Sequence, residues 1–248
     1  MAFQDLTQLQ ILEGTLGLIW ILAAVFIGLR VITKATSERK ELITVGLSYI
    51  FVSSAWWGVG LQFISYGFFD IIIGDILYLL VANIFIPVGL VCWVNSFAEM
   101  INPEIKNKLF IIFIPFCLIW EILIFVFAFT NLDLLGSLEG LFNSSHGDVI
   151  RYFIIIAILS FVVSGVYFSI RSMSLEDREI KWKGRFLLIA WISFAFGAIL
   201  DSMIQEVSAP LLIFIRLILI TGAIEYYLGF FLPNKLKGIL IKNRESYN

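Results

Sequence analysis

The sequence predicts an all-α integral membrane protein: a bundle of seven transmembrane helices with its N-terminus outside and its C-terminus in the cytoplasm. Of the 248 residues, 60% are hydrophobic and 15% are charged, and the mean hydropathy is +0.97. A soluble domain with so many apolar residues would have too few polar residues to cover its core. Long apolar runs and an uneven distribution of Lys and Arg support the same fold class.

A helix needs about 20 apolar residues to cross a bilayer, because each residue rises about 1.5 Å and the hydrocarbon layer is about 30 Å thick. Seven segments meet this requirement, and each is continuously apolar, unlike the alternating strands of a membrane barrel. They lie at about 13–32, 42–64, 75–97, 109–129, 149–172, 186–204 and 209–231. We therefore expect one seven-helix domain over residues 1–248, in which residues 232–248 form a basic cytoplasmic tail.

The basic residues predict the orientation. The connections after the first, third and fifth spans, together with the tail, hold 15 of the 17 Lys and Arg residues. The other two are Arg151 and Arg216, and the N-terminal segment has none. By the positive-inside rule, the N-terminus lies outside. We expect a multi-pass protein of the cell membrane, with the lipid bilayer as its first partner.

Two further patterns predict how the helices pack. Small residues four apart, such as Ala24 with Gly28 and Ser193 with Gly197, allow helices to approach closely in lipid. Pro87 in the third span removes a backbone hydrogen bond, which usually kinks a helix. We expect close helix seams and a kinked third span.

Ionisable residues inside the spans are the strongest functional signal, because a charge in the bilayer normally faces the bundle interior and finds a partner. The candidates are Glu121, Asp201, Arg216 and Glu225. Arg216 and Glu225 are nine residues apart, which puts them on opposite helix faces and about 13 Å apart along the axis. Each of the two therefore needs its own partner.

Asp201 is the expected partner of Arg216. The sixth and seventh spans are joined by a short connection, so they form an antiparallel pair with both residues near the outer surface. Glu121 lies at about the same depth on the fourth span. The three residues form either a structural ion pair that pins two helices or a ligand or ion site in the outer half.

Glu225 lies about two turns from the cytoplasmic end of the last span. It could satisfy a structural hydrogen bond, or it could couple a proton to helix movement. Trp56 with Trp57 and Gln62, and the third-span residues Asn83 and Asn95, could add aromatic and polar lining to a site. Residues of these types occur as often in helix cores.

The sequence predicts no enzyme, no cofactor and no catalytic or metal site. It has no HExxH motif, no membrane-embedded Ser/His pair and no Gly-rich phosphate loop. Cys92 and Cys117 lack CxxC spacing, and we expect His146, the only histidine, to be a solvated loop residue. Nothing indicates a nucleic-acid partner.

Two stretches carry a family resemblance: "KWKGRFLLIAWISFAFGAILD" at 181–201 and "EYYLGFFLPNKLK" at 225–237. They resemble the seven-transmembrane sensor modules that precede prokaryotic, especially archaeal, histidine kinases. The resemblance implies signal transduction, and we expect the output to pass to a separate cytoplasmic protein partner. Rhodopsins share only the topology, since the last span has no lysine for a retinal Schiff base.

Three function classes follow from these observations. A receptor or sensor-like protein is the first expectation, and its ligand is not specified by the sequence. The alternatives are a transporter or channel, for which charged midplane residues are also typical, and a non-catalytic subunit of a larger membrane complex.

Overall fold

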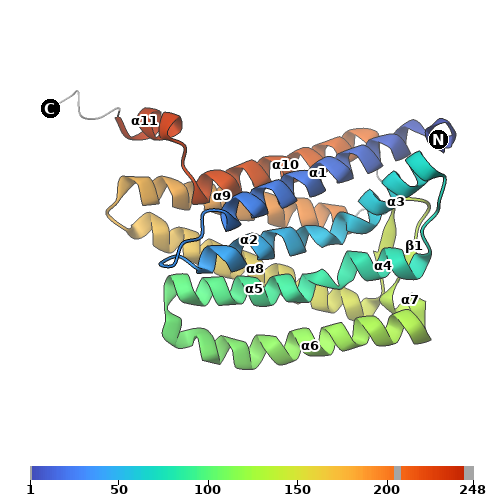
Figure 1. Cartoon of the computed structure of the whole chain (residues 1–248), viewed down its shortest axis with the longest axis horizontal. Coiled ribbons are helices and arrows are strands. Elements are labelled where there is room, and N and C mark those ends of the chain that lie inside the picture. Colours follow the sequence, from blue (N-terminus) through green and yellow to red (C-terminus); the bar gives the residue numbers. More distant parts are fainter. Residues whose placement is uncertain (1, 204–207, 243–248) are drawn as a thin grey trace.

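The computed structural model describes residues 2–203 and 208–242 of the chain. Within these ranges, seven helical segments are long and apolar enough to cross a membrane, and each overlaps one predicted span. The prediction of a helical, multi-pass membrane protein is confirmed at this level (Figure 1). The last residue of the sixth predicted span and residues 243–248 of the predicted tail lie outside the described residues.

The elements follow one another in a simple order. The α-helices are α1 (Gln8–Ile32), α2 (Glu41–Val52), α3 (Trp57–Phe69), α4 (Asp75–Asn83), α5 (Phe85–Ile101), α6 (Lys106–Thr130), α7 (Leu132–Leu135), α8 (Asp148–Ser174), α9 (Arg178–Met203), α10 (Ala209–Phe230) and α11 (Asn234–Lys242). The 3-10 turns are η1 (Ala2–Asp5), η2 (Ser53–Trp56) and η3 (Pro103–Ile105), and the strands are β1 (Gly136–Leu138) and β2 (Ser144–His146).

Six of the long segments close into a ring. Neighbouring helices pack in the order α1, α2, α5, α8, α9 and α10, and α10 returns to α1. The seventh, α6, packs mainly on α5 and so lies at the edge of the bundle (Figure 1). The interior of the ring is filled by buried aromatic side chains, including Trp20, Trp93, Trp191 and Tyr226.

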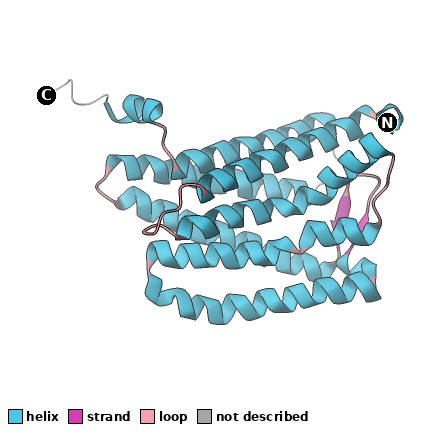
Figure 2. Cartoon of the chain, in the orientation of Figure 1, coloured by secondary structure: helices cyan, strands magenta, loops and turns pink. Residues whose placement is uncertain are grey.

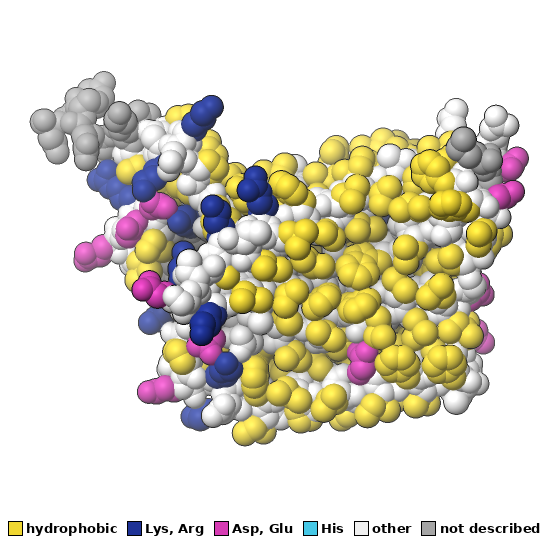
Figure 3. Space-filling view, in the orientation of Figure 1, with side chains coloured by type: hydrophobic (Ala, Val, Ile, Leu, Met, Phe, Trp, Pro, Cys, Tyr) yellow, Lys and Arg dark blue, Asp and Glu magenta, His cyan; other side chains and the backbone are white. Residues whose placement is uncertain are grey.

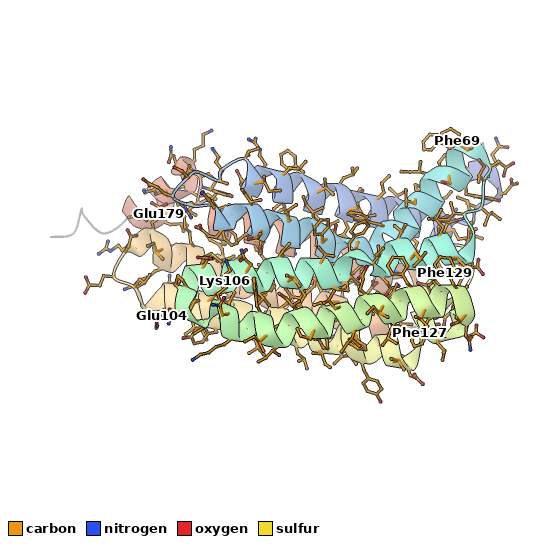
Figure 4. The ribbon with its side chains drawn as sticks, turned by 60° about the horizontal axis from the view of Figure 1, so that its bottom comes forward. Phe69, Glu104, Lys106, Phe127, Phe129 and Glu179 are labelled. Atoms are coloured by element: carbon orange, nitrogen blue, oxygen red, sulfur yellow. The ribbon has the colours of Figure 1, made fainter. Side chains whose placement is uncertain are left out.

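Charge separates the two ends of the bundle. The basic end carries residues 33–40, 102–105 and 175–177 and α11, and its lysines and arginines cluster on one side of Figure 3. The acidic end carries η1, residues 70–74, α7 and the two strands, and Arg151 is its basic side chain. Figure 4 shows Glu104, Lys106 and Glu179 at the basic end, and Phe69, Phe127 and Phe129 toward the acidic end.

On the face that Figure 3 shows, the surface between the two ends is largely apolar, with an isolated acidic side chain among the apolar ones. On α6, Ile111 is 73% exposed and Phe129 is 71% exposed. A continuous apolar surface of this kind is unfavourable in water but matches the hydrocarbon of a bilayer.

Two predicted spans are broken rather than continuous. The span at 42–64 is divided into α2, η2 and α3, and the Ser53 hydroxyl donates to the Ile50 carbonyl at 2.6 Å beside the break. The span at 75–97 is interrupted at Ile84, where Pro87 removes the donor that would bond the carbonyl of Asn83. The break in the span at 42–64 was not predicted, whereas the interruption at Ile84 lies where the kink at Pro87 was expected.

The close seam between α1 and α2 depends on two glycines. Gly28 and Gly46 face each other, and a Cβ on Gly46 would overlap the carbonyl oxygen of Gly28. Since a backbone atom cannot move aside as a side chain can, this crossing requires glycine. The Ala24 and Gly28 spacing in the sequence indicated this seam.

The acidic end is covered by an ordered cap between α6 and α8. There α7 leads into an antiparallel ribbon in which Gly136 pairs with His146, so the all-α description needs this small addition (Figure 2). Phe142 is buried, and its carbonyl accepts a hydrogen bond from the Tyr78 hydroxyl at 2.9 Å. The cap therefore closes over the interior of the bundle.

Candidate functional site

A buried ion pair lies toward the acidic end of the bundle. Arg216 Nη1 is 3.0 Å from Asp201 Oδ1 and 3.1 Å from Oδ2. The Arg216 side chain is 4% exposed and that of Asp201 is 22% exposed. The structure thus brings together two of the residues that the sequence singled out.

Local structure explains why the pair forms. Asp201 lies in the last turn of α9, and Arg216 lies two turns into α10. Because these helices are antiparallel neighbours, the two residues reach the same level along the bundle axis.

Trp56 is the third member of this cluster. The break at η2 turns its indole toward the pair, and Nε1 donates to Asp201 Oδ2 at 2.7 Å. The Arg216 guanidinium lies 5.9 Å from the centre of the Trp56 ring, within range of a cation–π interaction. Asp201 therefore accepts hydrogen bonds from two different elements.

Glu13 is a residue that sequence reasoning missed. The predicted first span begins at about residue 13, but the Thr7 and Gln10 capping box starts α1 at Gln8, which places Glu13 inside the helix. Its carboxylate is half-buried and interacts electrostatically with Arg216 and Asp201. Asp201 is the carboxylate that bonds Arg216, and Glu13 acts on the pair through longer-range electrostatics.

The other proposed lining residues do not join the cluster. They make separate hydrogen bonds: Trp57 Nε1 to Ser53 Oγ at 3.1 Å, Ile73 N to Gln62 Oε1 at 3.0 Å, Asn83 Nδ2 to the Leu79 carbonyl at 2.8 Å, and Asn95 Nδ2 to Thr44 Oγ1 at 3.0 Å. These contacts hold the broken helices and the α2–α5 seam together.

Glu121 also lies apart from the ion pair. It is carried by α6, which packs mainly on α5 rather than on α9 or α10. Its side chain is half-buried, and Oε2 is buried without a hydrogen-bond partner among the described residues. The three residues predicted as one candidate site therefore divide into a pair and a separate carboxylate.

Glu225 makes its own contact nearer the basic end. The Ser193 hydroxyl of α9 donates to Glu225 Oε2 at 3.0 Å, which is the kind of hydrogen bond that the sequence suggested. The α9–α10 pair is thus joined at two levels, by Arg216 and Asp201 toward the acidic end and by Glu225 and Ser193 toward the basic end.

A line of aromatic rings connects these two levels. Trp20 packs edge-to-face on Trp56 at 5.6 Å and on Tyr49 at 6.3 Å between ring centres. Tyr49 in turn stacks on Tyr226 at 4.3 Å, and Tyr226 packs against Trp191 at 5.9 Å. The rings form a well-packed group that extends from the level of the ion pair to the level of the Glu225–Ser193 contact.

These rings enclose a small cavity of about 20 Å³, room for about one water molecule. Trp20 and Trp191 both line it, and both are more than nine-tenths buried. Their indole Nε1 atoms have no hydrogen-bond partner in the described part of the chain. Trp191 Nε1 lies against Gly165, which does not line the cavity, so the unpartnered indole donors are not assigned to the cavity wall.

His146 is not the solvated loop residue that was expected. It pairs with Gly136 in the ribbon, its side chain is half-buried, and Nδ1 has no partner among the described residues. Burial, assisted by the neighbouring positive charge of Arg151, lowers the pKa of His146 to about 4. The imidazole is therefore neutral at pH 7.

The site offers recognition groups rather than a set of metal ligands. Among the described residues, no three His, Cys, Asp or Glu side chains are grouped to hold a metal ion. A guanidinium with an adjacent indole N–H is instead well suited to bind a carboxylate or another anion. Comparison with protein families, with curated proteins and with solved structures finds no match to this chain.

Proposed function

We propose that this chain is a receptor or sensor-like protein of the cell membrane, with its N-terminus outside and its C-terminus in the cytoplasm. It has no catalytic activity of its own and signals through a separate cytoplasmic protein. The observation that carries this proposal is the Asp201–Arg216–Trp56 cluster, which joins α9, α10 and η2 at one level of the bundle.

The chemistry of the cluster suggests the ligand class. The Asp201 carboxylate is bound by the Arg216 guanidinium and by the Trp56 indole N–H. A small carboxylate or similar anion could take its place, and Glu13 would oppose a ligand of high negative charge. Such an exchange would release α9 from α10 at the acidic end.

The α9–α10 pair supplies the route to the other end. Both helices run the length of the bundle, and their second contact, between Glu225 and Ser193, lies at the level of the Trp191 and Tyr226 rings. A change at Arg216 would therefore alter how the two helices meet at the basic end, where a cytoplasmic partner would bind.

The test uses nitroxide labels at two basic-end positions, Ser37→Cys and Glu176→Cys, in a Cys92→Ala/Cys117→Ala background. Interspin distances are measured by pulsed EPR in nanodiscs for the wild type, for Arg216→Gln and for Asp201→Asn. We expect both substitutions to shift the distance distribution, whereas the exposed-pair control Arg151→Gln leaves it unchanged. The same distances in all variants, with only a lower melting temperature, would show that the pair is a structural pin and that the proposal is wrong.

Ligand class and partner are tested separately. Sodium acetate should reproduce the distance shift in the wild-type protein, and sodium chloride at equal ionic strength should not. A photo-reactive amino acid at Glu176 in native membranes should capture one cytoplasmic protein. Solute flux through proteoliposomes would instead favour the transporter or channel alternative.

A second candidate function, a non-catalytic subunit of a larger membrane complex, is favoured by Glu121. This carboxylate lies on the peripheral helix α6, whose outward side chains are strongly exposed, and Oε2 lacks a partner in the described part of the chain. A basic or hydrogen-bonding residue of another membrane protein would satisfy it. Cross-linking from Phe129→Cys in native membranes would identify such a subunit, and Glu121→Gln should weaken the cross-link.

A further inference from the structure

The chain continues past the last long helix into α11, a nine-residue helix (Figure 1). Three residues, 231–233, separate the end of α10 from the start of α11. An extended chain covers at most about 3.6 Å per residue, so α11 begins within roughly 11–15 Å of the end of α10. If α10 spans a bilayer, α11 therefore starts at or close to the headgroup layer.

The sequence of α11 is amphipathic in a way that suits this layer. At 100° per residue, Leu236, Ile239 and Leu240 fall within one arc of the helix, and Lys235 and Lys237 lie about 100° to either side of Leu236. Ile239 is 63% exposed and Leu236 and Leu240 are partly buried, so the bundle covers only part of this arc. Lysines on both flanks of an apolar arc can extend to headgroups while the arc enters the acyl region.

One ion-pair cluster ties α11 to the bundle. Lys237 Nζ forms a salt bridge with Glu179 Oε2 at the start of α9, and Lys183 Nζ lies 2.7 Å from Oε1 of the same carboxylate. The hydrogen bond from Lys237 to Glu179 raises the pKa of Lys237, which keeps the amine charged. Glu179 is therefore paired with the Lys237 amine, which an anionic headgroup would otherwise bind.

The surroundings of α11 are strongly basic. Exposed cationic side chains at the same end include Lys34, Arg39, Lys40, Arg171, Arg178 and Lys235 (Figure 3). This charge complements an anionic surface, and the exposed part of the apolar arc, at Ile239, favours lipid over an acidic soluble protein.

We propose that α11 is a membrane-surface helix that binds anionic lipid headgroups through Lys235 and Lys237, and that Glu179 competes for Lys237. In a neutral bilayer the Glu179 contact holds α11 against α9. In an anionic bilayer the headgroup phosphates take over Lys237, and α11 settles into the interface with Ile239 toward the acyl chains. This inference does not depend on the receptor proposal.

The experiment places a nitroxide at Ile239→Cys in the Cys92→Ala/Cys117→Ala background. The full-length protein is reconstituted in nanodiscs of phosphatidylcholine alone or with increasing phosphatidylglycerol. Label depth is measured by EPR collision rates with oxygen and with a water-soluble nickel chelate. We expect the oxygen-to-nickel ratio to rise at least threefold as phosphatidylglycerol is added, and the rise to be reversed by high salt.

Two variants test the residues. Lys235→Gln/Lys237→Gln should abolish the rise, whereas the control Lys34→Gln/Lys40→Gln, at the same end but outside α11, should retain it. In Glu179→Gln, the oxygen-to-nickel ratio should reach half of its full rise at no more than half the phosphatidylglycerol fraction that the wild type requires. An unchanged ratio in both lipids would overturn the proposal. A label that stays accessible to nickel in every lipid would likewise overturn it, because α11 would then remain in water.

Discussion

Arg216 holds Asp201 with a single nitrogen: Nη1 lies 3.0 Å from Oδ1 and 3.1 Å from Oδ2, and the second Asp201 contact comes from Trp56. Asp201 is thus fixed by α10 and η2 together, so the pair determines how three elements meet. Since the Arg216 guanidinium is almost fully buried, breaking this pair should lower the free energy of unfolding much more than breaking a surface ion pair.

The first prediction is a double-mutant cycle on this pair. Asp201→Asn and Arg216→Gln should each lower the free energy of unfolding by about 3–5 kcal/mol, because each leaves one buried charge without its partner. The double variant should recover much of that loss. Reversible unfolding in mixed detergent measures all four proteins, and Arg151→Gln, in an exposed pair with Asp148, should cost less than about 1 kcal/mol. Strictly additive losses would mean that the two residues do not interact.

The second prediction concerns the Trp56 indole. Trp56→Phe removes the N–H that donates to the Asp201 carboxylate at 2.7 Å, so it should cost about 1.5–3 kcal/mol of unfolding free energy. Trp57→Phe is the matched control, because Trp57 donates to the uncharged Ser53 hydroxyl and its loss should cost about 0.5–1.5 kcal/mol. Equal losses would show that the hydrogen bond to Asp201 has no special strength.

The sequence predicted long-range features where one physical rule dominated. Seven apolar runs could be recognised as spans because polar side chains are unfavourable in the hydrocarbon layer. Asp201 could be paired with Arg216 because a short connection places both residues at a similar depth. Glu13 was missed because its role depends on how α1 turns relative to α10, which the pattern of a single helix does not determine. The break at η2 was missed because Ser53 and Trp56 are compatible with a continuous helix until their partners are known.

The separation of Glu121 from the ion pair and the ordered cap were not predicted, for related reasons. The depth of Glu121 in the membrane could be predicted from the sequence. The position of its helix, α6, at the edge of the bundle is set by packing among all seven segments. The ribbon around Phe142 depends on contacts with Tyr78, which is far away in the sequence.

The third prediction tests the glycine seam. Gly46→Ala places a methyl group against the Gly28 carbonyl, so α1 and α2 must separate, and we expect a loss of about 1–3 kcal/mol. Gly74→Ala is the control, since a Cβ there meets nothing within 4 Å. Thermal unfolding in detergent compares the two, and an unchanged melting temperature for Gly46→Ala would rule out the close crossing.

The fourth prediction tests the orientation. In the Cys92→Ala/Cys117→Ala background, a thiol at Ser137→Cys should react with a membrane-impermeant maleimide applied to intact cells, because it lies at the acidic end. A thiol at Glu176→Cys should react only after permeabilisation. The thiol is placed at Glu176 and not at the neighbouring Asp177, because Asp177 Oδ1 accepts hydrogen bonds from the backbone N–H groups of Glu179 and Ile180 at the start of α9. The reverse pattern would place the N-terminus in the cytoplasm.

The last prediction is a pH dependence that originates at His146. Its pKa of about 4 in the folded protein lies below the usual value of 6.5, because burial and Arg151 disfavour the charged imidazole. Between these two values the unfolded chain binds more protons than the folded one, so stability falls as the pH falls from about 6.5 toward 4 and is fully present above 6.5. The loss from pH 7 to pH 5 should be about 2 kcal/mol.

His146→Gln isolates this effect. The variant cannot take up a proton, so its unfolding free energy should change about 2 kcal/mol less than that of the wild type between pH 7 and pH 5. Carboxylates titrate in both proteins and cancel in the comparison. Parallel pH profiles for the two proteins would mean that His146 is as solvated in the folded state as in the unfolded chain, and the ribbon would then not shield it.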